Sequence, residues 1–120
     1  MSKRNLKIGE LGEEKAVELL KNKSFKILDR NVETKYGEID IVARDNETIV
    51  FVEVRSRSGL HFGLPEKTIK KRKKRKLIEN AKRYINYKNI KNPYRIDVVG
   101  VVFNKSKKVN RIKHYRNITL

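Results

Sequence analysis

Apolar residues recur with two different periods along the chain, and these periods predict its helices and strands. Helical spacing predicts an amphipathic helix over residues 6–22, with an apolar stripe that includes Ala16 and Leu20. Pro65 suits the first turn of a second helix that runs to about Tyr87. The predicted strands are 25–31, 38–44, 48–56, 95–103 and 109–116. The order α-β-β-β-α-β-β is typical of an α/β fold with a mixed sheet flanked by helices, and 120 residues predict a single domain over 1–120.

Two carboxylates on neighbouring predicted strands are candidates for one site. Glu38 and Asp40 point to the same side of their strand because side chains alternate, and Glu53 and Arg55 share a side of the next strand. A tight hairpin turn at Asp45-Asn46 pairs these two strands. Counting outward from that turn places Asp40 one or two steps from the position opposite Glu53, and a slip of one residue would separate the two acids.

The apolar surroundings of Glu53 suggest what such a pair would hold. An acid on an apolar strand is costly to bury unless a cation meets it. Together with the Val54 carbonyl, Asp40 and Glu53 form an all-oxygen set that suits Mg²⁺ or Mn²⁺, and such an ion can activate a water against a phosphodiester. The alternative is a plain ion-pair cluster of Asp40, Glu53 and Arg55 at the sheet edge, and their spacing does not separate the two hypotheses.

Charge is divided unevenly between the two halves of the chain. The sequence has 31 Lys+Arg against 14 Asp+Glu, a net charge of +17. Residues 1–60 hold 12 basic and 11 acidic residues, whereas residues 61–120 hold 19 and 3. A basic half of this kind predicts nucleic acid as the partner. The alternatives are an anionic membrane or charge for solubility, but no wide apolar helix face supports a membrane partner.

A run of seven basic residues opens the second predicted helix, and we expect it to contact phosphates with strong salt dependence. The alternative is a charged face that only meets solvent. The predicted nucleic-acid-binding residues are Arg57, Lys70, Lys71, Arg72, Lys73, Lys74, Arg75 and Lys76. The absence of cysteine excludes disulfides, and no apolar stretch suits a signal peptide or a membrane span, so the cytoplasm is the expected location.

Several motifs, in order across nearly the whole chain, resemble one known family. They are Gly9-Glu10-Leu11-Gly12-Glu13-Glu14-Lys15-Ala16, Gly37-Glu38-Ile39-Asp40-Ile41-Val42-Ala43, Phe51-Val52-Glu53-Val54-Arg55-Ser56-Arg57 and Arg95-Ile96-Asp97-Val98-Val99. The chain resembles the YraN-like family of small bacterial proteins, which share the restriction-endonuclease-like fold with archaeal Holliday junction resolvases. The resemblance therefore implies that fold here.

The resemblance also implies roles for matching residues. The nuclease core of this fold is an Asp on one strand and Glu-x-Lys on the next, aided by a Glu on the first helix. The implied metal ligands are Asp40, Glu53 and Glu13, and Arg55 completes the implied catalytic set. Arg55 departs from the pattern: arginine stays protonated and cannot act as a base, although it can stabilise a phosphate. Lys73 is a candidate for the missing amine.

Two of these assignments have structural alternatives. Glu13 lies at the apolar margin of its helix, but an acid in a first helical turn is also favoured by the helix dipole. Lys73 belongs to the buried edge of the second helix, where its stem can cover the core while its ammonium group reaches solvent.

Two function hypotheses follow. The first is a Mg²⁺- or Mn²⁺-dependent endonuclease, on DNA rather than RNA, with branched or structured DNA favoured by fold analogy alone. The second is a non-catalytic DNA- or RNA-binding module that keeps the nuclease fold, which Arg55 favours. A homodimer is suggested by the resolvase relatives.

Further residues have expected places outside the acidic core. Tyr36, His61 and Phe62 lie in predicted loops beside the carboxylates and are candidates for substrate contact. Asp97 is expected to pair with Arg95 rather than to bind metal. Three tyrosines are expected to pack in the core, namely Tyr84, Tyr87 and Tyr94.

Overall fold

One mixed β-sheet organises the computed structural model, which describes residues 7–59 and 64–119. The strands lie in the order β1-β2-β3-β4-β5, so neighbours in the chain are neighbours in the sheet. Strand β3 pairs with β4 in parallel, and the other pairs are antiparallel. The strands are β1 Lys26–Thr34, β2 Gly37–Asp45, β3 Thr48–Ser58, β4 Tyr94–Phe103 and β5 Val109–Tyr115. The predicted class and the order α-β-β-β-α-β-β are confirmed.

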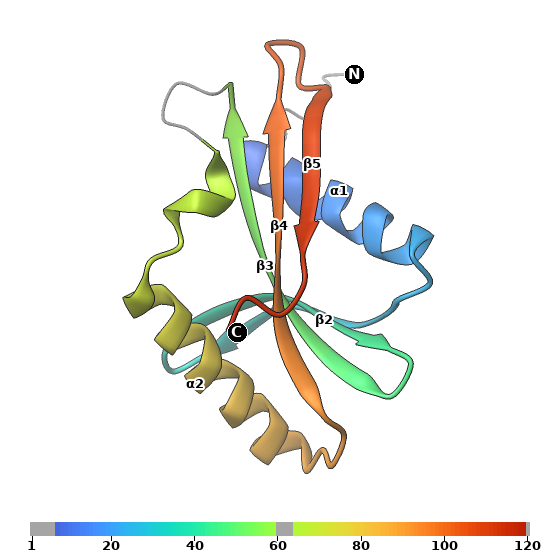
Figure 1. Cartoon of the computed structure of the whole chain (residues 1–120), viewed down its shortest axis with the longest axis vertical. Coiled ribbons are helices and arrows are strands. Elements are labelled where there is room, and N and C mark those ends of the chain that lie inside the picture. The colour runs from blue at the N-terminus through green and yellow to red at the C-terminus, as the bar shows by residue number, and fades with distance from the viewer. Residues whose placement is uncertain (1–6, 60–63, 120) are drawn as a thin grey trace, which may run out of the picture.

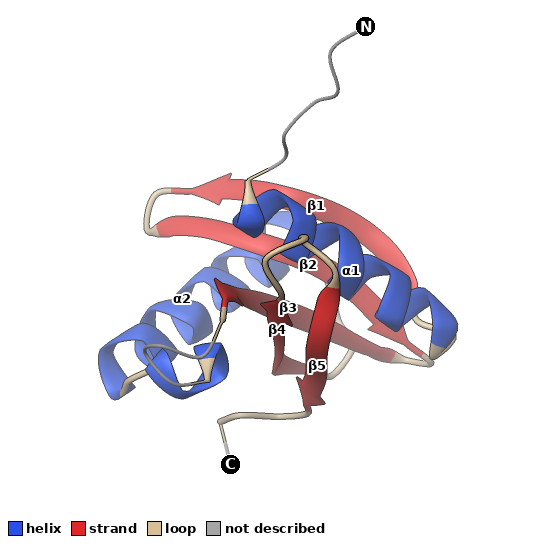
Figure 2. Cartoon of the chain, turned by 90° about the horizontal axis from the view of Figure 1, so that it is seen from above, coloured by secondary structure: helices blue, strands red, loops and turns tan. Residues whose placement is uncertain are grey.

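Two helices, α1 Ile8–Asn22 and α2 Lys71–Lys88, cover the sheet (Figure 1). Each helix packs its buried stripe into its own apolar cluster. Helix α1 contributes Ala16 and Leu20 to a cluster with Val50 and Val52 of β3. Helix α2 contributes Leu77 and Ala81 to the other cluster, with β3 residues from alternate positions, including Ile49 and Phe51. Side chains alternate along a strand, so β3 is a central strand covered on both faces (Figure 2).

The second helix begins later than predicted. Pro65 starts a separate short 3-10 helix, η1 Pro65–Thr68, and α2 begins only at Lys71. Ile69 and Lys70 between them are extended. Glu66 explains the break, because its carboxylate accepts a hydrogen bond from Tyr115 Oη at 2.8 Å and pairs with Arg111 at the same distance, which fixes η1 on the end of the sheet.

The hairpin turn between β2 and β3 also differs by one residue from the prediction. Asp45 pairs with Thr48, so the two turn residues are Asn46 and Glu47 rather than Asp45 and Asn46. Asn46 adopts the left-handed conformation, with φ of 53°, that such a tight turn requires. This shift brings Ile41 opposite Val52, the last pair of the ladder, so Asp40 and Glu53 are the next residues on their strands. The two acids are therefore closer than the sequence predicted.

Strand β1 is longer than predicted. It begins at Lys26 and continues past residue 31 to Thr34, and its pairing with β2 shifts register between Ile27 and Asp29. Within the described ranges, no helix has the length and apolar character needed to cross a membrane.

Candidate functional site

Four carboxylates from three elements gather where strands β2 and β3 separate, and we call them the carboxylate cluster. The ladder between these strands ends at the pair Ile41–Val52. Beyond it, the backbone N–H of Val54 donates to Asp40 Oδ2 at 2.8 Å, so a carboxylate takes the place of a strand neighbour. The cluster comprises Glu13 of α1, Glu38 and Asp40 of β2, and Glu53 of β3.

The oxygen atoms of three of these acids suit a single cation. One oxygen each of Glu13, Glu38 and Asp40 lies within 4.8 Å of the others. All are hard carboxylate donors, the type that Mg²⁺ and Mn²⁺ prefer. Helix α1 carries Glu13 one turn before Ala16 and Val17, which anchor it in the core, so the acid at the apolar margin turns toward the strands as its helical spacing predicted.

Glu38 is a member of this group that the sequence did not select. Its position two residues before Asp40, on the same side of β2, was the available signal. Glu53, which was selected, lies beside Asp40 but outside the group of three mutually close oxygens. The structure thus brings Glu13 and Asp40 together as expected and adds Glu38 to them.

The raised pKa of Asp40 reflects its burial first and the like charges around it second. Burial and then the negative charge of Glu53 raise the pKa of Asp40 from 3.8 to about 7, although the Val54 N–H bond acts in the opposite direction. Burial, followed by the charge of Glu38, also raises the pKa of Glu13 above its usual value, against the lowering effect of Arg30 at 3.9 Å. A divalent cation bound between these acids would relieve their repulsion. Carboxylates whose pKa is raised by burial and by like charges are more common in functional sites than in structural ion pairs.

Glu53 is held by cations of the chain itself. Its side chain is only 7% exposed, and its Oε2 lies 3.2 Å from Arg55 Nε and 3.6 Å from Lys73 Nζ. Lys73 comes from the first turn of α2, on the opposite face of the sheet from α1. The predicted position of Lys73 at the buried edge of the helix is confirmed, and its ammonium group points to the cluster rather than to open solvent.

The rest of the basic run, Lys70–Lys76, lies beside Lys73 at the start of α2. Lys73 and Lys74 are half-buried, whereas Lys70, Lys71, Arg72, Arg75 and Lys76 are exposed. Arg57 is half-buried further along β3, on the same side as Glu53. His61 and Phe62, candidates for substrate contact, lie outside the described residues, whereas Tyr36 is described and exposed.

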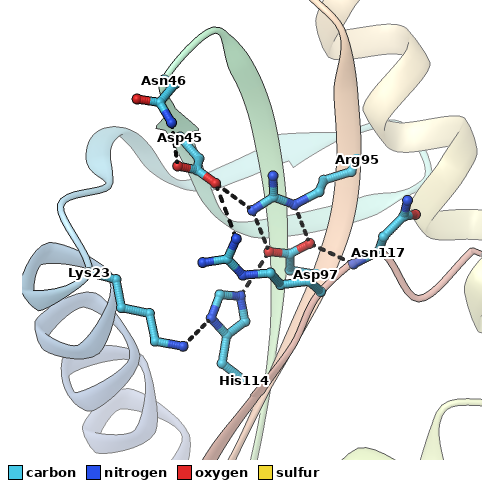
Figure 3. Close-up of polar contacts among 8 residues, drawn as sticks. Lys23, Asp45, Asn46, Arg95, Asp97, His114 and Asn117 are labelled. Carbon is cyan, nitrogen blue, oxygen red and sulfur yellow. Dashed lines mark hydrogen bonds and ion pairs between the residues drawn. The ribbon is translucent and has the colours of Figure 1, made fainter.

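A second polar cluster lies on β4 and β5 and contrasts with the first (Figure 3). Asp97 is fully buried, and it accepts hydrogen bonds from Arg95 Nε at 3.0 Å and from the Asn117 backbone N–H at 2.9 Å. His114 Nε2 lies 2.8 Å from its other oxygen, while Lys23 Nζ lies 2.9 Å from His114 Nδ1. The ammonium group can only donate, which assigns the hydrogen to Nε2.

Every bond in this Asp97 network compensates the buried charge. Burial alone would raise the pKa of Asp97, but the bonds from His114, Arg95 and Asn117 outweigh it and hold the pKa below its usual value. The predicted pairing of Asp97 with Arg95 is confirmed. A network in which each buried polar group has a hydrogen-bond partner stabilises the fold. In the carboxylate cluster, by contrast, Asp40 lies beside the like charge of Glu53.

The predicted packing tyrosines divide into two groups. Tyr84 is buried and contacts Phe51 edge-on, whereas Tyr94 is 38% exposed, although its ring also contacts Phe51 edge-on. Tyr87 is 84% exposed, so its assignment to the core was wrong. The apolar stripe of α2 passes through Leu77, Ala81 and Tyr84, and Tyr87 lies too far around the helix to join it.

Comparison with known proteins links the site to one family. The model of the family described as "Uncharacterised protein family UPF0102" matches residues 12–101, a range that contains the whole carboxylate cluster. A UPF0102 protein from Persephonella marina is 46% identical over 97 residues, which cover 80% of this chain and 84% of that protein. A UPF0102 protein from Caldicellulosiruptor saccharolyticus is 45% identical over 118 residues, 98% of each chain. A third, from Desulforamulus reducens, is 42% identical over 120 residues, again 98% of each. These matches confirm the resemblance to the YraN-like family.

Proposed function

The chain belongs to the uncharacterised protein family UPF0102, and from this premise we propose that it is a Mg²⁺- or Mn²⁺-dependent endonuclease that hydrolyses phosphodiester bonds, in DNA rather than RNA. The observation that carries the proposal is the convergence of Glu13, Glu38 and Asp40, with one oxygen each inside 4.8 Å, beside a helix that opens with the basic run. The carboxylates would hold the metal ion, and the basic residues beside them would bind the phosphates of the substrate.

The donor set fits the ion. Three carboxylates supply oxygen ligands, and the pKa of Asp40 near 7 indicates a site where a cation would replace a proton. Glu13, Glu38 and Asp40 would hold the ion, with Glu53 beside Asp40 as a further oxygen donor once its cations turn to substrate. When bound there, Mg²⁺ or Mn²⁺ supplies Lewis acidity and lowers the pKa of a coordinated water.

The cations beside Glu53 have separate tasks in this proposal. Arg55 keeps its charge at every working pH, so it stabilises the phosphate as negative charge develops and does not accept a proton. Lys73 reaches the same Glu53 oxygen from α2 and takes the place of the amine that the nuclease pattern puts at position 55. It orients the attacking water, while the exposed part of the basic run binds neighbouring phosphates.

Cleavage assays test the proposal directly. The purified chain is incubated with duplex, single-stranded, flap and four-way DNA in Mg²⁺ and Mn²⁺, beside Asp40→Asn, Glu13→Gln and the control Glu10→Gln, whose side chain is exposed on the same helix as Glu13. We expect the parent and Glu10→Gln to cut at least one substrate and the other two variants to lose about a hundredfold or more. Equal cleavage by Asp40→Asn would refute the site.

A second function is favoured by one observation. Glu53 already pairs with two cations of the chain, Arg55 and Lys73, and a stable ion-pair set needs no metal. The chain would then be a non-catalytic DNA- or RNA-binding module. Its signature is salt-sensitive binding without cleavage in any divalent ion, and with the same affinity for Asp40→Asn and parent.

A further inference from the structure

An exposed aromatic ring stands over the basic half of α2, in the hairpin that joins β1 and β2. The ring belongs to Tyr36, which is 44% exposed and two residues before Glu38 of the carboxylate cluster. The hairpin is fixed to the helix, because the Thr34 hydroxyl donates to Oδ1 of the buried Asn80 at 2.6 Å and accepts the Tyr36 backbone N–H at 3.1 Å. The ring is therefore positioned before any ligand arrives.

Helix α2 contacts Tyr36 along one stripe. The guanidinium carbon of Arg83 lies 4.2 Å from the ring centroid, and Arg83 NH2 donates to Tyr36 Oη at 2.7 Å. Tyr36 also lines a surface hollow of about 280 Å³, which we call the Tyr36 hollow. Tyr36 is 44% exposed and lines this hollow, so part of its side chain remains open to a ligand. The other lining residues follow helical spacing and are Arg72, Arg75, Lys76 and Glu79.

Residues on two sides of the Tyr36 hollow are close in the chain to residues that form or contact the carboxylate cluster. Arg72 is the neighbour of Lys73, whose ammonium group lies 3.6 Å from Glu53. On the other wall, Tyr36 is joined to Glu38 through a single residue, Gly37. A nucleic-acid strand with one phosphate at the cluster would therefore place an adjoining nucleotide at this hollow.

We propose that the Tyr36 hollow binds one unpaired nucleotide next to the scissile phosphate, with the base stacked on the Tyr36 ring and its phosphate held by Arg72, Arg75 and Lys76. A ring beside guanidinium and ammonium groups matches the two parts of a nucleotide, since bases stack on aromatic faces and phosphates bind Arg and Lys. A base inside a duplex is stacked on both sides and cannot reach the ring, so the preferred ligand is single-stranded or locally unpaired nucleic acid.

The inference rests on the proposed function only in taking nucleic acid as ligand, and it is tested without cleavage. Fluorescence anisotropy in EDTA measures binding of a labelled single-stranded 12-mer and of the corresponding blunt duplex. The variants are Tyr36→Ala, Tyr36→Phe, which keeps the ring, and Tyr87→Ala, which removes a more exposed tyrosine of α2 that does not line the Tyr36 hollow.

We expect Tyr36→Ala to bind the single strand roughly 5- to 100-fold more weakly, which is the effect of losing one stacked base. Its affinity for the duplex should change less than twofold, and Tyr36→Phe and Tyr87→Ala should bind the single strand within about twofold of the parent. A 2-aminopurine in the 12-mer should be quenched by the parent and by Tyr36→Phe but not by Tyr36→Ala.

A second variant removes cations instead of the ring. The double variant Arg72→Ser with Arg75→Ser should reduce the dependence of log affinity on log salt by about 1.4 for the single strand, since each phosphate contact contributes about 0.7. Unchanged single-strand binding by Tyr36→Ala, an equal loss on the duplex, or no binding of nucleic acid at all would overturn the inference. If the parent protein cuts no substrate but Tyr36→Ala still binds the single strand more weakly, the proposed nuclease is refuted and the nucleotide site is supported.

Discussion

Lys73 Nζ lies 3.6 Å from Glu53 Oε2, which connects the basic helix α2 to the acids of the central strands. Glu53 is buried, and Arg55 Nε lies 3.2 Å from the same oxygen. Among the described residues, that Nε atom makes no hydrogen bond, because its direction toward the carboxylate is unfavourable. Lys73 lies at the longer distance from Glu53 and is the more exposed of the two cations, 38% against 31%, so it is the better candidate to turn toward a phosphate or a water.

Lys73 should matter for cleavage in a way that its charge alone does not explain. Lys73→Arg keeps the charge but replaces the compact ammonium group with a larger planar guanidinium, which cannot hold a water at the same point, so we expect it to retain DNA affinity within about threefold and to lower kcat about tenfold or more. Lys73→Ala should lower both. Lys71→Ala, an exposed lysine of the same turn, is the matched control and should affect binding only. The measurement is single-turnover cleavage beside binding in EDTA, and equal kcat for Lys73→Arg and parent would exclude Lys73 from the chemistry.

The pKa of Asp40 makes the metal-free protein less stable as pH rises. Its pKa is about 7 in the folded chain against an ordinary 3.8, so between these values the folded state binds more protons than the unfolded state. The stabilising effect of this proton is complete below pH 4 and lost as pH rises to about 7. The loss is at most about 4 kcal/mol, from 3.2 units at 1.36 kcal/mol each.

Asp40→Asn tests this directly, since its amide oxygen can still accept the Val54 N–H. Urea unfolding in EDTA should show the variant gaining stability over the parent between pH 5 and pH 8, by about 1–4 kcal/mol. Mg²⁺ should stabilise the parent at pH 8 and have little effect on the variant. Glu10→Gln serves as the control and should follow the parent. A variant-to-parent difference that is the same at both pH values would contradict the raised pKa.

The sequence predicted which elements carry the acids of this site better than it predicted how the acids lie relative to one another. Helical spacing placed Glu13 at the apolar margin of α1, and strand alternation paired Glu38 with Asp40, because both depend on local periodicity. The position of Asp40 relative to Glu53 was less certain, since it depends on which residues form the turn. Asn46 takes a positive φ and forms the turn with Glu47, one residue later than predicted. The composition of the turn did not show this shift in the pairing of β2 with β3.

Long-range packing explains what the sequence did not predict. His114 lies on a polar strand with little sign of burial, yet its side chain is 1% exposed because α1, through Lys23, and β4, through Asp97, close around it. The end of η1 and the start of α2 were missed because Glu66 is tied to β5, far away in the chain. Neither contact leaves a local pattern.

Close packing between α1 and β3 fixes the position of Glu13, and Gly12 makes it possible. A Cβ atom at Gly12 would lie 1.7 Å from Ser56 Oγ and 2.9 Å from Ser56 Cβ. We expect Gly12→Ala to destabilise the protein by about 1–2 kcal/mol, because overpacking outweighs the gain in helix propensity. The double variant with Ser56→Gly should recover much of that loss.

Gly9→Ala is the matched control, because a Cβ atom there meets nothing within 4 Å. It should be neutral or stabilising by up to about 1 kcal/mol. Thermal or urea unfolding measures all three variants, and cleavage by Gly12→Ala should decrease because Glu13 moves with the helix. Equal stability for Gly9→Ala and Gly12→Ala would show that α1 does not need this contact.

The Asp97 network should govern stability in acid rather than catalysis. The pKa of Asp97 lies below its usual value, so its contribution to stability is present above pH 4 and lost as pH falls further, through the folded-state pKa. Among the described residues, Asp97→Asn leaves Arg95 with Asp45, 3.0 Å away, as its remaining acidic partner. We expect a loss of about 2–4 kcal/mol at pH 7, which is typical for a broken buried pair.

The difference between Asp97→Asn and the parent should shrink below pH 4, as the parent loses the same charge. Urea unfolding from pH 3 to pH 7 measures it, with the exposed Glu47→Gln as control. Below its melting temperature the variant should keep metal-dependent cleavage, because none of the bonds to Asp97 comes from the carboxylate cluster. If the folded variant lost cleavage, the division between a structural network on β4 and β5 and a chemical site at β2 and β3 would be wrong.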